Sequence, residues 1–365
     1  MTTTEIPTAA RTDLVGLSRA ALRSWLECSG HGAHERVVWT WMHRRGGRDF
    51  SGLAALNMPR DLIRRLTEEA VVGRLPVEFR HHSGDGTEKW LVVLPDGHRI
   101  ESVFIPETSR GTLCVSSQVG CTLTCRFCHT GTQPLARNLT AAEIVGQILV
   151  ARDLLDEWSL PGEAPRRLTN IVFMGMGEPF YNYDAVAEAI RVLMDRDGIA
   201  ISKRKITVST SGVIPGMLRC HEELGVNLSI SLHAARDDVR DGIMPINRKY
   251  PLAELMAVCR AYQGVSTSRR LLFAYTLLKG VNDSDEDAKA LLKLLDGLPS
   301  KVNLIPFNPW PGAPYEPSPM ERILAFQQIL HDARMITQIR HTRGEDILAA
   351  CGQLKTASRS LPQTL

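Results

Sequence analysis

Three cysteines lie close together in the run Cys121-Thr-Leu-Thr-Cys125-Arg-Phe-Cys128, with the spacing C-x3-C-x2-C. Thiolates at this spacing can hold three corners of a cubic iron–sulfur cluster, a site that normally has four cysteine ligands. The iron without a protein ligand could then bind a substrate or cofactor directly. A structural zinc site is the alternative. It needs four ligands, and the adjacent His129 or the upstream Cys114 could supply the fourth.

The composition is that of an ordinary soluble protein. The chain has 365 residues, of which 44% are hydrophobic and 23% charged, and its net charge of +3 neither requires nor excludes a nucleic-acid partner. Cys114 and the cysteine triplet crowd into one short stretch, which favours metal or redox chemistry over a disulfide framework. Residues 1–13 are polar, and no apolar stretch approaches the ~20 residues of a membrane span. We therefore expect no signal peptide, no membrane partner and a cytoplasmic location.

The sequence around the triplet divides into two regions with different secondary-structure patterns. Residues 1–80 predict a small helical accessory domain, with apolar periodicity at 17–26, 37–42 and 62–66. The basic turn at 43–48 lies beside Trp39 and Trp41, so it is either a solvated loop or part of an RNA-binding surface. Residues 81–106 predict a hairpin that links this domain to the rest.

Strands then alternate with helices. Predicted strands lie at 170–174, 206–209, 227–232, 271–277, 302–305 and 336–339, and predicted helices at 140–155, 184–194, 215–223, 251–262, 283–296 and 318–333. Thr140 and Glu143 have the form of a capping box at the start of the first of these helices, whose apolar positions keep mostly to one face, and Ser318 is the predicted N-cap of the last. Loop composition marks 156–166. Such alternation implies a parallel sheet with right-handed crossovers. We predict an α/β fold, a partial (β/α)6 TIM-like barrel over 107–346, with about six units after the triplet. A C-terminal loop and tail would follow at 347–365.

Polar residues cluster where the predicted strands end, at 175–179, 209–212, 231–233 and 308–309. The carboxyl ends of parallel barrel strands share one face, and active sites form there. Each cluster alone has a plainer explanation, such as a tight turn for Gly175-Met-Gly177 or a satisfied polar residue for His233.

Several longer stretches make the chain similar to the RlmN-type RNA adenine methyltransferases of the radical S-adenosylmethionine (SAM) superfamily. The resemblance extends over nearly the whole length of the chain, and the matching stretches lie at 85–90, 100–107, 114–121, 137–140, 175–179, 208–212, 303–309 and 343–354. The resemblance implies methylation of carbon 2 of an adenine in 23S ribosomal RNA, at the peptidyl transferase centre, and in tRNA anticodon loops. It also implies a monomer that uses an electron donor such as flavodoxin.

The resemblance assigns roles to five cysteines and one glutamate. Cys121, Cys125 and Cys128 would hold a [4Fe-4S] cluster, and two SAM molecules would be used per turnover. Carbon 2 is too electron-poor to attack the methyl group of SAM, so a radical route is needed. Cys351 would carry the methyl carbon, Cys114 would release the product by forming a disulfide, and Glu101 would accept the carbon 2 proton. Taken singly, these three could instead be a fourth cluster ligand, a half-buried strand cysteine and a surface glutamate.

The same resemblance names residues that would contact the cofactor. Gly177 and Glu178 would bind the SAM amino group, and the remaining contacts to ribose, carboxylate or adenine would come from Ser209, Ser231, Leu232, His233 and Asn308. Four arginines near these motifs could hold RNA phosphates, namely Arg126, Arg137, Arg340 and Arg343. The chain departs from the family at Ala274, where a Glu is common.

Two alternatives stay open on the sequence. A sister family, of the Cfr type, uses the same chemistry on carbon 8 of adenine. A non-catalytic RNA-binding paralogue with a structural metal would keep the fold without the reaction.

Overall fold

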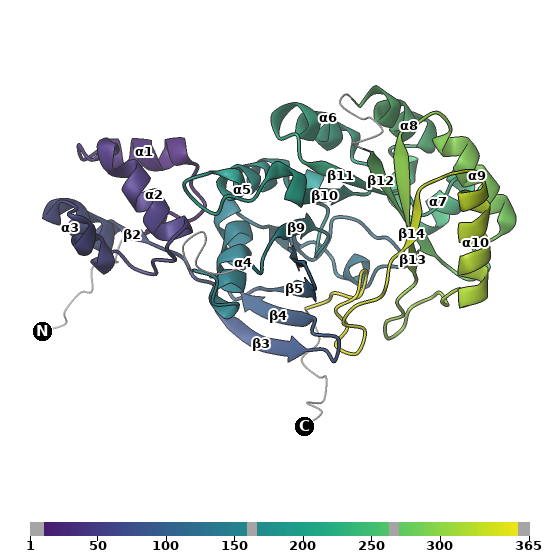
Figure 1. The fold of residues 1–365 in the computed structure, drawn as a ribbon, viewed down its shortest axis with the longest axis horizontal. Coiled ribbons are helices and arrows are strands. Elements are labelled where there is room, and N and C mark those ends of the chain that lie inside the picture. The colour runs from purple at the N-terminus through teal and green to yellow at the C-terminus, as the bar shows by residue number, and fades with distance from the viewer. Residues whose placement is uncertain (1–10, 159–165, 263–269, 357–365) are drawn as a thin grey trace, which may run out of the picture.

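The computed structural model describes residues 11–158, 166–262 and 270–356, so the start of the chain, most of the predicted loop at 156–166 and the tail after 356 lie outside it. One sheet of ten strands runs through the molecule (Figure 1). Its order is β14 (Thr337–Ile339), β13 (Ser300–Pro306), β12 (Leu271–Leu277), β11 (Asn227–Ser231), β10 (Ile206–Thr210), β9 (Asn170–Phe173), β6 (Arg110–Cys114), β5 (Arg99–Glu107), β4 (Glu88–Val93) and β3 (Val77–His82).

Strands β6 and β9 to β14 of this sheet are parallel and form an open barrel wall. The helices that follow the first six of them are α4 (Ala141–Leu154), α5 (Tyr183–Met194), α6 (Ile214–Glu223), α8 (Leu252–Ala261), α9 (Asp285–Leu295) and α10 (Met320–Asp332). The predicted α/β class and partial six-unit barrel are confirmed. The first unit begins with β6, before the cysteine triplet and not after it, because the triplet lies in the loop between β6 and α4.

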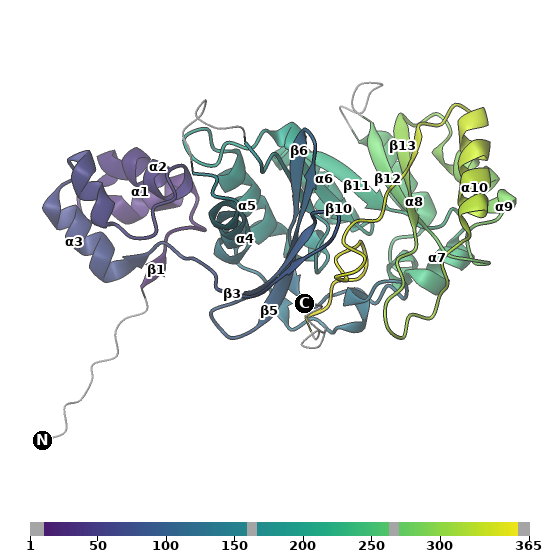
Figure 2. The same ribbon diagram turned by 60° about the horizontal axis from the view of Figure 1, so that its bottom comes forward.

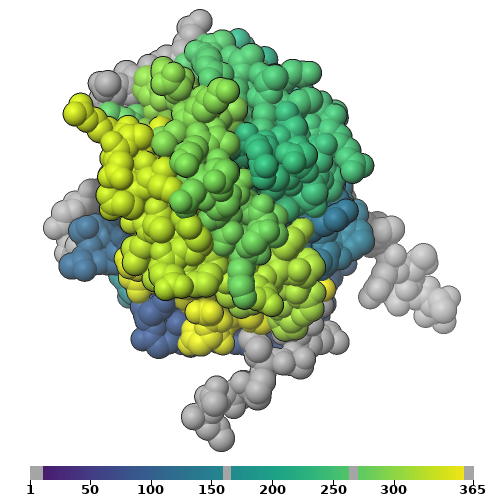
Figure 3. All heavy atoms as spheres, turned by 90° about the vertical axis from the view of Figure 1, so that its right-hand side faces the viewer, coloured from purple at the N-terminus to yellow at the C-terminus, as the bar shows by residue number. Residues whose placement is uncertain are grey.

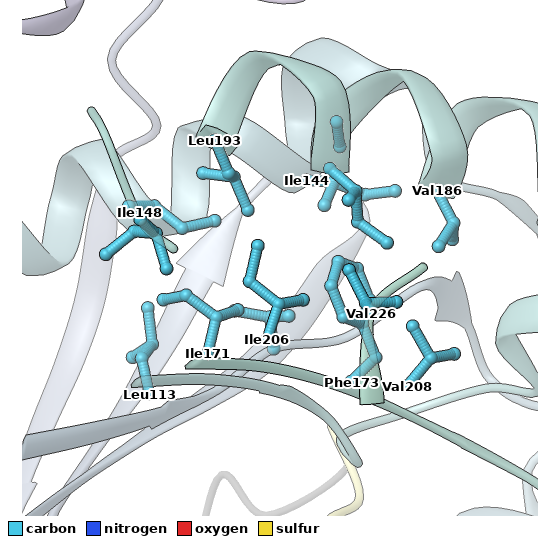
Figure 4. Packing of buried hydrophobic residues seen from close by; sticks show 14 of the residues in the cluster. Leu113, Ile144, Ile148, Ile171, Phe173, Val186, Leu193, Ile206, Val208 and Val226 are labelled. Atoms are coloured by element: carbon cyan, nitrogen blue, oxygen red, sulfur yellow. The ribbon is translucent and has the colours of Figure 1, made fainter. Parts of the chain in front are cut away.

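The predicted hairpin is confirmed as the antiparallel pair β4–β5. It is part of the main sheet, since β5 pairs with β6 and β6 pairs with β9. The domain boundary drawn at 106/107 therefore falls at the end of β5, inside a continuous sheet. Apolar side chains of the wall meet α4 and α5 in the core, as Figure 4 shows for Leu113, Ile171, Phe173, Ile206, Val208, Ile144, Ile148, Val186 and Leu193.

Two helices differ in detail from their predictions. The capping box of Thr140 and Glu143 opens α4 as expected, but residues 143–152 are buried on all sides, whereas the apolar pattern predicted one buried face. The sheet packs against one side of α4 and α5 against another, and the Arg152 guanidinium donates to the His43 carbonyl of the N-terminal helices at 2.6 Å. Ser318, the predicted N-cap of α10, donates its hydroxyl to Asp283 at 2.8 Å instead, and Pro319 takes the N-cap position.

The N-terminal helices α1 (Arg19–Glu27), α2 (Glu35–His43) and α3 (Arg60–Glu69) form a separate group beside the barrel (Figures 1 and 2). The short strands β1 (Thr12–Asp13) and β2 (Ala70–Val71) pair at its edge. Side chains fix the group to the barrel: the Trp39 indole donates to Asp195 at 3.0 Å, and Arg19 bonds to Asp197 at 2.6 Å. No helix among the described residues is long and apolar enough to span a membrane.

Candidate active site

The loop with the cysteine triplet leaves the barrel after β6 and is shaped by a short ladder, β7 (Gln118–Val119) with β8 (Arg137–Asn138). Backbone bonds tighten it further, with the Leu123 N–H donating to the Cys121 sulfur at 3.3 Å and the Cys128 N–H to the Cys125 carbonyl at 3.1 Å. A small apolar cluster that includes Leu123 packs against Cys121, Cys125 and Phe127. Cys121 and Cys125 thus share one apolar environment, and Cys128 is half-buried like them.

Burial raises the pKa of Cys121 to about 12. Burial also raises the pKa of Cys125, to which the Cys128 and Cys121 thiols add, and it raises the pKa of Cys128 against hydrogen bonds from Gly131 and Thr130. Such thiols become thiolates only when a positive group is bound beside them. Among the described residues, no three His, Cys, Asp or Glu side chains converge as ligands of a single metal ion. A cluster of several irons needs ligands around a volume and not around one point. The three cysteines and their apolar surroundings fit a cluster.

Two of the residues considered as a fourth ligand, His129 and Cys114, face other partners. The His129 ring nitrogen Nδ1 bonds to the Gln353 carbonyl at 3.2 Å. Cys114, at the end of β6, lines the barrel interior together with Cys351. All eight cysteines are free thiols in this structure.

A cavity of about 160 Å³ lies at the carboxyl ends of β9, β10 and β11. Gly177 lines it with a φ of +99°, and a side-chain carbon there would lie 2.5 Å from the Gln118 Cβ, so this close approach requires glycine. Glu178 accepts from the Ser211 N–H at 2.8 Å. Burial raises the pKa of Glu178, although the bond from Ser211 lowers it in part. A positive group in the cavity would lower the pKa further and favour the ionised carboxylate.

The next strand ends complete the cavity wall. The Ser209 and Ser231 hydroxyls are 3.4 Å apart. His233, held at a φ of +57°, accepts from the Thr276 N–H through Nδ1 at 2.9 Å, which leaves the hydrogen on Nε2. Burial, and then the charge of Arg240, lowers the pKa of His233 to about 3, so the ring is neutral. A neutral His233 with Nε2–H is a hydrogen-bond donor at this edge.

Two residues of this site went unnoticed in the sequence. Arg240 is fully buried on the short helix α7 (Asp237–Ile243), and its guanidinium donates to the carbonyls of Leu232, Ser231 and Ser211 at 3.0, 3.2 and 2.8 Å. No local pattern announces such a role. Ser229 lines the cavity with a buried hydroxyl that has no hydrogen-bond partner among the described residues. The sequence could have indicated Ser229, because residues two apart on a strand face the same side and Ser231 was already predicted to contact the cofactor.

A larger cavity of about 1160 Å³ occupies the barrel interior, and Cys351 lines both cavities. Burial, and then the nearby Cys351, raises the pKa of Cys114 to about 12. Cys351 also contributes to the raised pKa of Cys128, after burial. Cys351 therefore lies close to both Cys114 and the triplet.

Cys351 belongs to a segment that we call the C-terminal strap (residues 344–356), which has no helix or strand. It lies beside the end of the β3–β4 hairpin (Figure 3), where the Gly344 N–H donates to Asp85 at 3.0 Å. Asn308, predicted to contact SAM, donates to the Cys351 carbonyl at 3.1 Å and accepts from the Thr342 hydroxyl at 2.9 Å.

Glu101 is not a surface residue. Its side chain is 3% exposed and lies 3.1 Å from the Lys89 ammonium. It also accepts from the Lys355 N–H in the strap at 2.8 Å. It extends from the same face of β5 as Val103 and Ile105, which line the larger cavity. The structure thus brings Glu101 to the interior side of the sheet.

The four arginines separate into three groups. Arg137 bonds to both oxygens of Glu143 at 2.7 and 2.8 Å, which makes it part of the loop's own structure. Arg126 is exposed on the triplet loop. Arg340 and Arg343 line the larger cavity, which is where an RNA phosphate could meet them.

Comparisons with known proteins agree on one family. The radical SAM superfamily matches residues 115–292. The dual-specificity RNA methyltransferase RlmN of Rhodospirillum rubrum is 58% identical over 96% of this chain and 81% of its own, and that of Rhodopseudomonas palustris (strain BisB5) is 52% identical over 96% and 91%. A crystal structure of a radical SAM methyltransferase from Sphaerobacter thermophilus superposes with a TM-score of 0.87 at 42% identity, covering 94% of this chain and 99% of that one.

Proposed function

The chain belongs to the RlmN family of radical SAM RNA methyltransferases, and we propose that it methylates carbon 2 of an adenine in 23S ribosomal RNA, at the peptidyl transferase centre, and in tRNA anticodon loops. The position of Cys351 carries this proposal. It lines both the small cavity beside Glu178 and the interior cavity that contains Cys114. A methyl carrier must meet a cofactor on one side and RNA on the other.

The [4Fe-4S] cluster would be held by Cys121, Cys125 and Cys128, and with SAM it supplies a 5′-deoxyadenosyl radical when bound. The Cys351 thiolate would first attack the methyl carbon of one SAM, S-adenosylhomocysteine would leave, and Cys351 would become S-methylcysteine. It then presents that methyl group toward the small cavity for hydrogen abstraction. The methylene group left after abstraction would add to carbon 2 of the adenine, and the adduct would lose the carbon 2 proton to Glu101 and one electron, which the cluster would take up. The Cys114 thiolate would then attack the Cys351 sulfur. The bond from that sulfur to the methylene carbon would break, the carbon would take a proton to become the new methyl group, and the Cys114–Cys351 disulfide would form.

The other residues bind and move protons. Gly177 and Glu178 would hold the SAM amino group. The Glu178 carboxyl is buried, and the positive charge of that amino group would pair with its ionised form. Ser209, Ser231, Leu232 and His233 would contact the rest of the cofactor. Glu101, reached from the interior face of β5, would accept the proton from carbon 2.

We further propose that the enzyme acts as a cytoplasmic monomer, consumes two SAM molecules per turnover and receives electrons from a donor such as flavodoxin. A cytosolic thiol system would reduce the disulfide of Cys114 and Cys351 after each turnover. The adenine must leave its stack to reach Cys351, so loops and other single-stranded RNA are the expected substrates.

Nucleoside mass spectrometry tests the proposal. Ribosomal RNA and tRNA from a strain that lacks the gene should contain no 2-methyladenosine, and the reconstituted enzyme should restore it. Recovery of 8-methyladenosine instead would move the chain to carbon 8 chemistry. Reconstitution without iron uptake or SAM cleavage would favour a non-catalytic RNA-binding protein.

A further inference from the structure

The C-terminal strap is buried although it lacks regular structure. Ala350, Gln353 and Leu354, around Cys351, are 4, 2 and 4% exposed. A buried segment of this kind must find partners for its backbone polar groups elsewhere in the fold. The location of those partners determines what holds Cys351 in place.

Three successive strap carbonyls are bonded by the two residues that follow the cysteine triplet. The His129 N–H donates to the Gly352 carbonyl at 2.7 Å, the His129 Nδ1 bonds to the Gln353 carbonyl at 3.2 Å, and the Thr130 hydroxyl donates to the Leu354 carbonyl at 2.6 Å. Because a carbonyl only accepts, Nδ1 must carry the ring hydrogen. The strap is thus tied to the triplet loop directly beside a cluster ligand.

Trp310 braces this contact from the loop after β13. Its ring stacks on the His129 ring with centroids 4.6 Å apart and planes 6° apart. Its indole N–H donates to the Phe127 carbonyl at 3.1 Å, and next to it the Gln353 side chain donates to the Pro309 carbonyl at 2.7 Å. The triplet loop, the β13 loop and the strap therefore interlock around one imidazole.

We propose that His129, braced by Trp310, is a positioning residue that sets the place of the Cys351 sulfur relative to the triplet loop. The inference rests on the proposed role of Cys351 as methyl carrier. Hydrogen transfer needs the reacting atoms about 3–3.5 Å apart, and a displacement of about 1 Å can cost about a hundredfold in rate. His129 follows Cys128 directly and bonds to both residues after Cys351, to Gly352 through its backbone N–H and to Gln353 through its ring, so its placement controls that distance.

The test compares His129→Ala with His129→Asn in the reconstituted holoenzyme. Both should bind the wild-type amount of iron. In His129→Ala, abstraction should miss the methyl group more often, so the 5′-deoxyadenosine formed per methylated adenine should rise about tenfold. Asn can donate from nearly the same point as Nδ1, so His129→Asn should return the ratio close to the wild-type value.

A second readout does not need the cluster. Alkylation of Cys351, followed by peptide mass spectrometry in cluster-free protein, should be several-fold faster in His129→Ala and Trp310→Leu than in the wild type, and unchanged in His129→Asn. Unchanged alkylation together with an unchanged product ratio would overturn the inference. Loss of iron in both His129→Ala and Trp310→Leu would also overturn it, because the ring would then serve the cluster alone. By contrast, methylation that persists in Cys351→Ala would remove the carrier role itself.

Discussion

The two sides of the active site are built differently. On the cofactor side, neighbouring parallel strands place Ser209 opposite Ser229, and backbone register fixes both. On the side of Cys351, the proposed methyl carrier, the strap depends on side-chain bonds from residues far away in the sequence, such as Asn308 to Cys351 and His129 to Gln353. Backbone bonds between neighbouring strands hold the wall in place, whereas the strap is held by a few bonds from distant residues. The site thus combines a rigid half with an adjustable half.

The largest effects are expected from removing the thiol of Cys125, a proposed cluster ligand, or of Cys351, the proposed methyl carrier. The two variants separate these two roles. Cys125→Ala should lose the cluster, SAM cleavage and methylation together. Cys351→Ala should keep iron and SAM cleavage but lose methylation by a factor on the order of 10⁴ or more, as for the loss of a covalent nucleophile. Iron analysis, 5′-deoxyadenosine assay and nucleoside analysis measure the three properties. Methylation at the wild-type rate by Cys351→Ala would contradict the division.

Arg240 tests how rigid the cofactor side is. Arg240→Leu would leave buried carbonyls of Ser211, Ser231 and Leu232 without their donor, which should lower the free energy of unfolding by about 3 kcal/mol or more. Arg236→Ala on the same stretch is a matched control. Its side chain is 50% exposed in an ion pair with Asp287, so its loss should cost less than about 1 kcal/mol. Equal denaturation midpoints for the two variants would show that Arg240 does not support the wall.

The regular elements on the cofactor side could be predicted from the sequence, whereas the contacts of the irregular strap could not. Strong local signals found the elements: the apolar run at 170–174 became β9, and the capping box of Thr140 and Glu143 opened α4. Polar residues at strand ends, such as Ser231, were found because parallel strands end on one face. The short helix α7 was missed because seven residues are too few to show a helical period.

The strap shows why the rest could not be predicted. The importance of Cys351 came through resemblance, but its partners did not, because no periodicity links Gln353 to a histidine that precedes it by most of the chain length. The burial of Glu101 was open for the same reason: the strap that helps to cover it comes from the far end of the sequence. Contacts between irregular segments leave no pattern in either segment.

Asp85, which accepts a hydrogen bond from the start of the strap, should make the stability of the protein depend on pH. Partial burial alone would raise the pKa of Asp85, but hydrogen bonds from Thr87 and the Gly344 N–H outweigh it and lower the pKa to about 2. A depressed carboxyl pKa stabilises the fold above the ordinary value near 4, and this stabilisation is lost as pH falls from about 4 to 2. Asp85→Asn should therefore be less stable than the wild type at pH 7 by about 1 kcal/mol, a figure that allows for solvent screening of a partly exposed group.

The difference between the two proteins should shrink as the pH approaches 2, because the wild-type carboxylate then becomes protonated. Urea midpoints for both proteins at several pH values measure it. A difference that stays constant down to pH 2 would mean that Asp85 acts through its shape and not through its charge.

A Ser229 variant should give the smallest effect. It tests whether Ser229 contacts SAM in addition to the residues that the sequence predicted, such as Ser209 and Ser231. Its buried hydroxyl lacks a partner among the described residues and lines the small cavity, and such groups are normally satisfied by a ligand or water. If bound SAM supplies the partner, Ser229→Ala should weaken SAM binding about fivefold, equal to about 1 kcal/mol for one neutral hydrogen bond. Calorimetric titration of the reconstituted enzyme measures this. Because the strand ladder is unchanged, the denaturation midpoint should not fall. Tighter SAM binding by Ser229→Ala would mean that the hydroxyl faces only apolar atoms of the cofactor, and the polar wall would then begin at Ser231.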